Sequence, residues 1–156
     1  MTVAATTAWR TLARPLRVSR SPRGLDAAWA WTVGQLPRLM PRRSRLWRRS
    51  GEIMSLREQV SGRGTAWLAQ EASRLRALVR RGRASEADLN AAMAIVCEAA
   101  RSVMGLSPHR EQIMGALALG SGAVAEMATG EGKTLAAALA ATIAGWRGRG
   151  THLVTV

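Results

Sequence analysis

The sequence predicts an α/β fold that is rich in helix and carries one strand–helix–strand unit over residues 123–156. Three observations support this prediction. Apolar residues recur at helical spacing between residues 65 and 119. Two short apolar segments, A-V-A-E-M at 123–127 and T-H-L-V-T-V at 151–156, have the composition of strands. An Ala- and Leu-rich run at 133–146 separates them and is a strong helix former. The 156 residues are enough for one domain at most.

The positive charge is concentrated in the first third of the chain. Residues 1–50 hold eleven arginines and one acidic residue, a net charge of +10, whereas residues 51–156 carry only +3. We therefore divide the chain into a basic Trp- and Arg-rich arm at 1–50, partly disordered or amphipathic, and a folded part at 51–156. Such an arm favours polyanions, either acidic lipid head groups or nucleic acid. The alternative is that the excess of arginine reflects only the overall composition of the chain and that the arm binds no polyanion.

Two segments of the arm have recognisable patterns. Residues 25–36 place apolar side chains on one helical face, before Pro37 and Pro41. P-R-R-S-R-L-W-R-R-S at 41–50 interleaves Arg with Trp47. That mixture suits a bilayer interface, a nucleic-acid strand, or a solvated linker whose tryptophans pack on the domain. Of the two ligands, we expect an acidic phospholipid surface at residues 10–49 and do not favour nucleic acid.

The folded part begins with three predicted helices. The first covers 65–81 and stops at a glycine. The second starts at Ser85, whose S-E-A-D sequence is close to a capping box, and ends before Gly105, with Val96 and Val103 on its inward face. The third covers about 109–119. The lone Cys97 excludes a disulfide framework and a zinc cluster and is expected to be a buried apolar residue.

The residues E-M-A-T-G-E-G-K-T-L at 126–135 carry the chemistry. A phosphate chain needs converging backbone N–H groups, which Gly130 and Gly132 allow the chain to present, and a helix N-terminus. Lys133 is the only lysine among 23 basic residues, and a compact ammonium reaches phosphate oxygens where the broad arginine fork does not fit. Thr134 offers a hydroxyl for Mg²⁺. The sequence thus predicts a phosphate-binding loop, with Met127 where the strict pattern has glycine, as in helicase-type motors.

The same stretch resembles a specific family. A-E-M-A-T-G-E-G-K-T-L, followed by G-R-G-T-H-L-V-T-V and preceded by M-G-L-S-P-H-R-E-Q-I-M-G, is similar to the first nucleotide-binding domain of SecA, the preprotein translocase ATPase. The similarity covers about residues 65–156. It implies a RecA-like P-loop NTPase fold and ATP with Mg²⁺ as cofactors.

The resemblance also implies roles for individual residues. Gln112 would read the adenine edge, and His109 stands where the family has an aromatic ring. The phosphates and Mg²⁺ would be held by the loop and the first helical turn: Met127, Thr129, Gly130, Glu131, Gly132, Lys133 and Thr134.

Function follows by the same resemblance. The family couples ATP binding and hydrolysis to export of preproteins through a SecY-type channel, at the cytoplasmic face of the bacterial inner membrane, and the full-length family forms homodimers. The 156 residues hold no Asp or Glu after Glu131, so we expect them to bind ATP without hydrolysing it and assign no catalytic residue. The alternatives are part of a nucleic-acid helicase motor, or a non-enzymatic basic remnant at the membrane surface.

Overall fold

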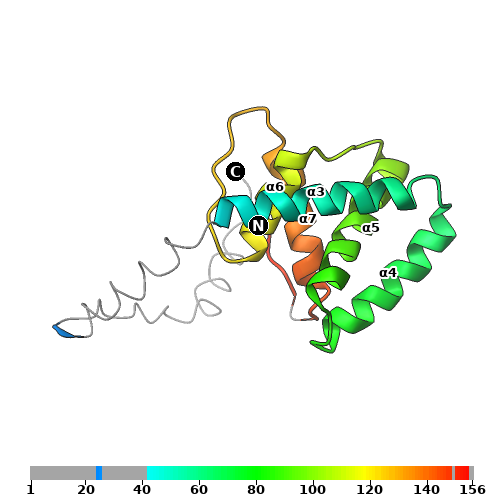
Figure 1. The fold of residues 1–156 in the computed structure, drawn as a ribbon, viewed down its shortest axis with the longest axis horizontal. Helices are drawn as coiled ribbons and strands as arrows, with labels where there is room; N and C mark the ends of the chain where they lie inside the picture. The colour runs from blue at the N-terminus through cyan, green and yellow to red at the C-terminus, as the bar shows by residue number, and fades with distance from the viewer. Residues whose placement is uncertain (1–23, 26–41, 149, 155–156) are drawn as a thin grey trace, which may run out of the picture. The chain divides into compact units, whose positions relative to one another are not determined.

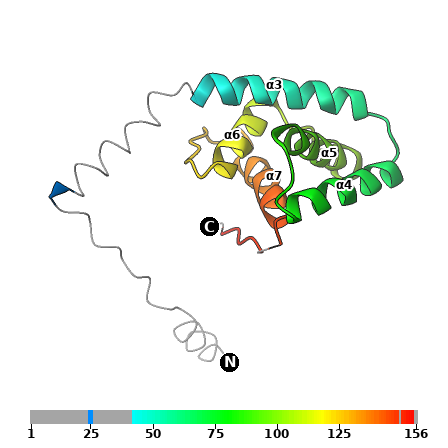
Figure 2. The ribbon, with the colours of Figure 1, turned by 60° about the horizontal axis from the view of Figure 1, so that its bottom comes forward.

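The computed structural model describes residues 24–25, 42–148 and 150–154. Its helices are α3 (Arg42–Val60), α4 (Thr65–Arg80), α5 (Glu86–Met104), α6 (Arg110–Gly120) and α7 (Lys133–Gly145). They belong to one compact unit, Pro41–Val156 (Figures 1 and 2). The expectation of a helix-rich chain is confirmed.

The predicted helix ends agree with the structure because local signals set them. Ser85 accepts a hydrogen bond from the Asp88 amide at 3.1 Å, and the Asp88 carboxylate accepts one from the Ser85 amide at 2.9 Å. These reciprocal bonds are the expected capping box of α5. Gly105 ends the same helix with φ of 70°, in the left-handed region that suits glycine.

Helix α3 begins inside the segment assigned to the basic arm and continues past residue 50. Arg, Leu and Trp are compatible with helix, and several arginines here have partners on the folded unit. Arg45 pairs with Glu86, and Arg49 donates to the Asn90 side-chain oxygen at 2.7 and 3.1 Å. The division of the chain at residue 50 stays a prediction. The predicted helix at 25–36 lies, apart from Leu25, outside the described residues.

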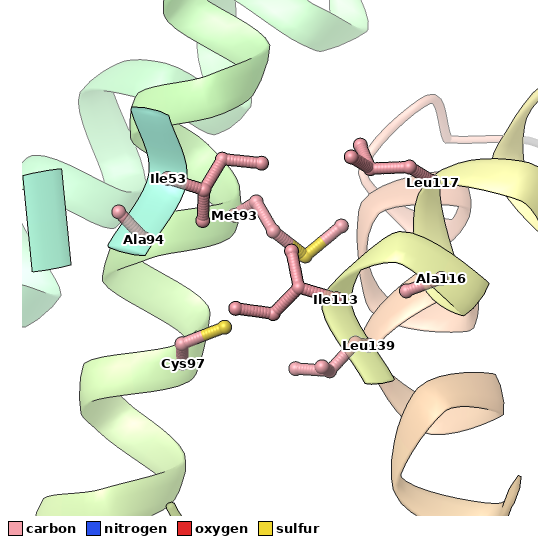
Figure 3. Packing of buried hydrophobic residues seen from close by; sticks show 8 residues of the cluster. All are labelled: Ile53, Met93, Ala94, Cys97, Ile113, Ala116, Leu117 and Leu139. Carbon is pink, nitrogen blue, oxygen red and sulfur yellow. The ribbon is translucent and has the colours of Figure 1, made fainter. Parts of the chain in front are cut away.

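Helix α5 is the centre of the unit and packs against α3, α4 and α7, while α6 packs against α3 and α7. The largest core cluster forms where α3, α5, α6 and α7 meet (Figure 3). Its buried members are Ile53, Met93, Ala94, Cys97, Ile113, Ala116, Leu117 and Leu139. A second cluster, of Leu68, Leu75, Ala92 and Ile95, joins α4 to α5.

The prediction for Cys97 is confirmed, because its side chain is fully buried in the first cluster. Burial raises the pKa of this thiol to about 12, and the nearby positive charge of Arg57 only partly opposes the shift. Cys97 therefore contributes packing and not a reactive thiolate.

The strand–helix–strand unit is not observed. Its helix is present as α7, but neither 123–127 nor the described part of the second segment, 151–154, is a strand. Val124 and Val154 are 95% and 94% exposed, opposite to the expected burial. A strand is held by hydrogen bonds to neighbouring strands and by cover on its faces, and the described residues supply neither. Composition alone therefore predicted these strands wrongly.

The inward face predicted for α5 is also wrong at its C-terminal end. Val103 and Met104 are 74% and 68% exposed, whereas Ala94, Cys97 and Glu98 face the interior. Helical spacing identifies an apolar stripe but not the neighbour that covers it. The stripe instead forms one wall of a groove beside the predicted phosphate loop.

Candidate functional site: the loop between α6 and α7

The loop at 128–132 has the backbone that its glycines predict. Gly130 and Gly132 have φ of 91° and 81°, a region where side chains other than glycine are strained. The Glu131 amide donates to the Ala128 carbonyl at 3.2 Å, and the Ala128 amide donates to the Glu131 carboxylate at 2.8 Å. These two bonds close a compact turn before α7. In this structure the Glu131 side chain therefore holds the loop itself.

The loop leads directly into the N-terminus of α7. Gly132 is the N-cap residue and has no side chain to cap the helix, so amides of the first turn lack an intrahelical or side-chain acceptor. Lys133 and Thr134 occupy that turn and are exposed. Open amides at a positive helix end, beside an ammonium and a hydroxyl, form a donor set that fits an anionic phosphate chain.

Gln112 of α6 contacts this loop from the other side. Its Nε2 donates to the Glu131 carbonyl at 2.9 Å, and its Oε1 accepts from the His109 amide at 3.0 Å. A Cβ atom added to Gly132 would lie 2.3 Å from the Gln112 Nε2, so the Gln112 side chain would have to shift. Glycine is thus favoured at 132 by its φ, and any side chain there would also force the Gln112 carboxamide to move. The structure brings together two site residues that are 20 positions apart in sequence.

Met127 packs against the middle of α6, beside Gly115. Its Sδ would lie 3.2 Å from a Cβ added to Gly115, and the Ala136 Cβ would lie 3.7 Å from the same atom. Gly115 therefore allows α6, α7 and Met127 to meet closely. This role for Gly115 was not predicted, since nothing in the local sequence distinguishes it from another glycine on a helix.

A groove of about 740 Å³ opens beside the loop. Its lining includes His109, Gln112, Gly132 and Thr134, so it contains four of the residues singled out from the sequence. The remaining wall is mostly apolar and is formed by α5, the segment after it, and α7: Val96, Ala99, Ala100, Val103, Met104, Leu106, Ser107, Leu135, Ala138, Leu139 and Thr142. An apolar groove with a few converging polar groups is the usual character of a small-molecule site.

Two arginines anchor the start of α6 to α3, and neither was predicted. Arg110 lies over the Trp47 ring at 3.6 Å from its centroid and donates to the Trp47 carbonyl at 2.7 Å. Arg57 donates to the Pro108 carbonyl and the Ser107 hydroxyl, both at 3.0 Å. These contacts fix the turn that leads to Gln112. Such pairs are 50 to 63 positions apart, so no local pattern indicates them.

Comparison with known proteins identifies the family of the chain. The family model of the SecA DEAD-like domain matches residues 39–156, more than half of the chain. The chain belongs to the SecA DEAD-like domain family. The resemblance first seen in the loop sequence is confirmed, and the coarser fold expectation, a P-loop NTPase type, follows from the family.

Individual relatives extend the match. The SecA-family chain is 41% identical to protein translocase subunit SecA 2 of Chlorobium chlorochromatii in an alignment of 149 residues that covers 86% of this chain and 20% of that relative. It is 39% identical to protein translocase subunit SecA of Oleidesulfovibrio alaskensis over 105 residues, 67% of this chain and 12% of that relative. A SecA of Beutenbergia cavernae is 48% identical over 91 residues, 58% of this chain and 9% of the relative.

The SecA-family chain thus spans about a tenth to a fifth of the curated relatives it matches. No solved structure matches it. Among the residues that the structure describes, no helix is long and apolar enough to cross a membrane. The described residues also contain no group of three His, Cys, Asp or Glu side chains that could hold a metal ion.

Proposed function

We propose that the loop at 127–134, together with Gln112, binds an adenine nucleotide as part of a SecA-like protein-translocation motor. The observation that carries the proposal is the contact between the Gln112 carboxamide and the Glu131 carbonyl at 2.9 Å, next to Gly132. It places the residue expected to read a base beside the loop expected to hold phosphates. The groove at this junction supplies an apolar wall for a planar ring.

Each group has a chemical task in this proposal. The open amides of the first turn of α7 donate hydrogen bonds to the phosphate oxygens, and the Lys133 ammonium neutralises their charge. The Thr134 hydroxyl would contribute to Mg²⁺ coordination, and that ion would offset further phosphate charge when bound. Met127, Thr129, Gly130 and Glu131 shape the loop. The match to the SecA family supports this proposal over a nucleic-acid helicase.

The partners and place of action are proposed from the relatives, whose names describe them as protein translocase subunits. We propose that the whole protein acts on preproteins at a membrane channel, from the cytoplasmic face of a bacterial inner membrane. Acidic phospholipid remains the ligand proposed for residues 10–49. Arg45, Arg48 and Arg49 are already in ion pairs with carboxylates, so the remaining arginines of that range carry the lipid proposal.

Titration of fluorescent ADP against the full chain tests nucleotide binding. We compare the wild type with Lys133→Ala and with Arg147→Ala, which removes an exposed cation beyond the other end of α7. Loss of one charge-assisted phosphate contact is expected to weaken ADP binding by about tenfold or more in Lys133→Ala and to leave Arg147→Ala close to wild type. Equal weakening in both variants would show that net charge, and not this loop, attracts the nucleotide.

A further inference from the structure

The turn before Gln112 is held by a largely buried charged group, the Arg57 guanidinium, that the proposed site does not include. Arg57 of α3 has only 14% of its side chain exposed, and its two terminal nitrogens donate to the Ser107 hydroxyl and the Pro108 carbonyl at 3.0 Å each. Pro108 itself is fully buried. A planar guanidinium that satisfies two acceptors at once fixes the orientation of the turn as well as its position.

The Arg57 guanidinium also faces a buried carboxylate, that of Glu98. Its Nε lies 3.9 Å from the Glu98 carboxylate, which is 1% exposed. Arg101 binds the same carboxylate at 2.9 and 2.6 Å. The bonds from Arg101, together with the nearby charge of Arg57, lower the pKa of Glu98 although burial acts in the opposite direction, so Arg57 remains a counter-charge of this carboxylate on its own account. Arg57 and Arg101 thus share one buried partner, but of the two only Arg57 reaches the turn.

The Ser107–Pro108 turn sets the orientation of the Gln112 side-chain carboxamide. The His109 amide, directly after Pro108, donates to the Gln112 Oε1 at 3.0 Å, and the Gln112 Nε2 donates to the Glu131 carbonyl. A carboxamide has two N–H donors and an oxygen with two lone pairs, so one donor and one acceptor site remain for a ligand. Adenine offers the complementary pair, an amino donor beside a ring-nitrogen acceptor, whereas guanine presents two acceptors at the same edge.

We infer that Arg57 is a positioning residue that makes the nucleotide site selective for adenine over guanine. This inference rests on the proposed nucleotide-binding function. Arg57 touches neither base nor phosphate; it fixes the Ser107–Pro108 turn, the turn fixes the His109 amide, and that amide keeps the oxygen of Gln112 on the side where it meets the adenine amino group. Loss of Arg57 lets the carboxamide rotate, so that either purine finds a partner while phosphate binding is preserved.

The test is a competition of ADP, GDP and inorganic pyrophosphate against fluorescent ADP on the full 156-residue chain. The wild type is expected to prefer ADP over GDP by about tenfold or more, the discrimination of one well-oriented hydrogen-bonded pair. Arg57→Met is expected to reduce this ratio to about threefold or less, with pyrophosphate affinity unchanged. Arg57→Lys keeps the positive charge beside Glu98 but loses the planar guanidinium that binds two acceptors at once. It is therefore expected to keep the preference for ADP over GDP only in part.

Arg101→Met is the matched control, because it disturbs the same buried carboxylate without touching the turn. It is expected to keep the wild-type ratio of ADP to GDP affinity. If Arg57→Met keeps that ratio as well, or if the wild type binds ADP and GDP equally, the inference is overturned. If Arg57→Met does not fold, Ser107→Ala, which removes one of the two acceptors, decides the question: a reduced ratio supports the inference and an unchanged ratio overturns it.

The proposed function fails in a different way. Wild-type chain that binds neither ADP nor pyrophosphate, or Lys133→Ala that binds both as well as the wild type, would overturn the nucleotide site itself. A phosphate-dependent site without a preference between purines would overturn only the role of Arg57.

Discussion

Substitution of Gly132 by alanine perturbs the site at its most crowded point. The new Cβ would lie 2.3 Å from the Gln112 Nε2, and the residue would have to keep a φ of 81°. Alanine in the left-handed region costs roughly 1–2 kcal/mol. Displacing Gln112 loses its two hydrogen bonds, at about 0.5–1.5 kcal/mol each. We therefore expect Gly132→Ala to lower the free energy of unfolding by about 2–5 kcal/mol.

Gly130→Ala supplies the matched control. Gly130 also has positive φ, 91°, but an added Cβ would meet nothing within 4 Å. Its substitution is expected to cost only the backbone strain, about 1–2 kcal/mol. The difference between the two variants then measures the contact with Gln112, separately from the strain that both glycines relieve.

Urea unfolding of Gly132→Ala, Gln112→Ala and the double variant completes the measurement. Once Gln112 is removed, Gly132→Ala is expected to cost about as much as Gly130→Ala, which gives a coupling energy of roughly 1–3 kcal/mol. A coupling energy below about 0.5 kcal/mol would refute the reasoning, because sites without mutual contact add within that limit.

Three further predictions concern the rest of the unit. Ser85→Ala removes the capping box of α5 and should lower the free energy of unfolding by about 1 kcal/mol in urea, whereas an unchanged midpoint would contradict the capping role. Cys97, with its pKa raised to about 12 by burial, should react with a thiol reagent at pH 8 only after unfolding; labelling at the same rate with and without urea would show that it is accessible. Glu98 has a pKa lowered below its ordinary 4.5 by Arg101, so its contribution to stability is present above pH 4.5 and lost as the pH falls through the folded-state value. The melting temperature of Glu98→Gln should therefore fall less in acid than that of the wild type, and an equal fall would contradict the assignment.

The parts of the structure that the sequence predicted well are those fixed by neighbours along the chain. The capping box at Ser85 and the left-handed glycine at 105 set the ends of α5 within a few residues. The loop glycines also follow from a local rule, since positive φ at 130 and 132 is required by the turn they make. Gln112 was singled out by the resemblance of its sequence surroundings to the SecA family.

The parts that were missed depend on contacts between distant segments. Arg57 reaches Pro108 across 51 positions, and Arg110 reaches Trp47 across 63, so no periodicity reveals them. The predicted strands were wrong because strand formation depends on a neighbouring strand, which composition does not supply. The exposed position of Val103 was missed for the same reason. Helical spacing shows that a helix has an apolar face, but it does not show whether another element packs on that face.

Hydrogen–deuterium exchange of the full chain with and without ADP tests the central claim most directly. Bound nucleotide should slow exchange in two separate segments, the loop and first turn of α7 at 128–136 and the turn into α6 at 107–113, and Lys133→Ala should lose both effects. Slower exchange that is confined to the arginine-rich α3 or α4, or that is equal in Lys133→Ala, would contradict a nucleotide site formed by Gln112 and the loop.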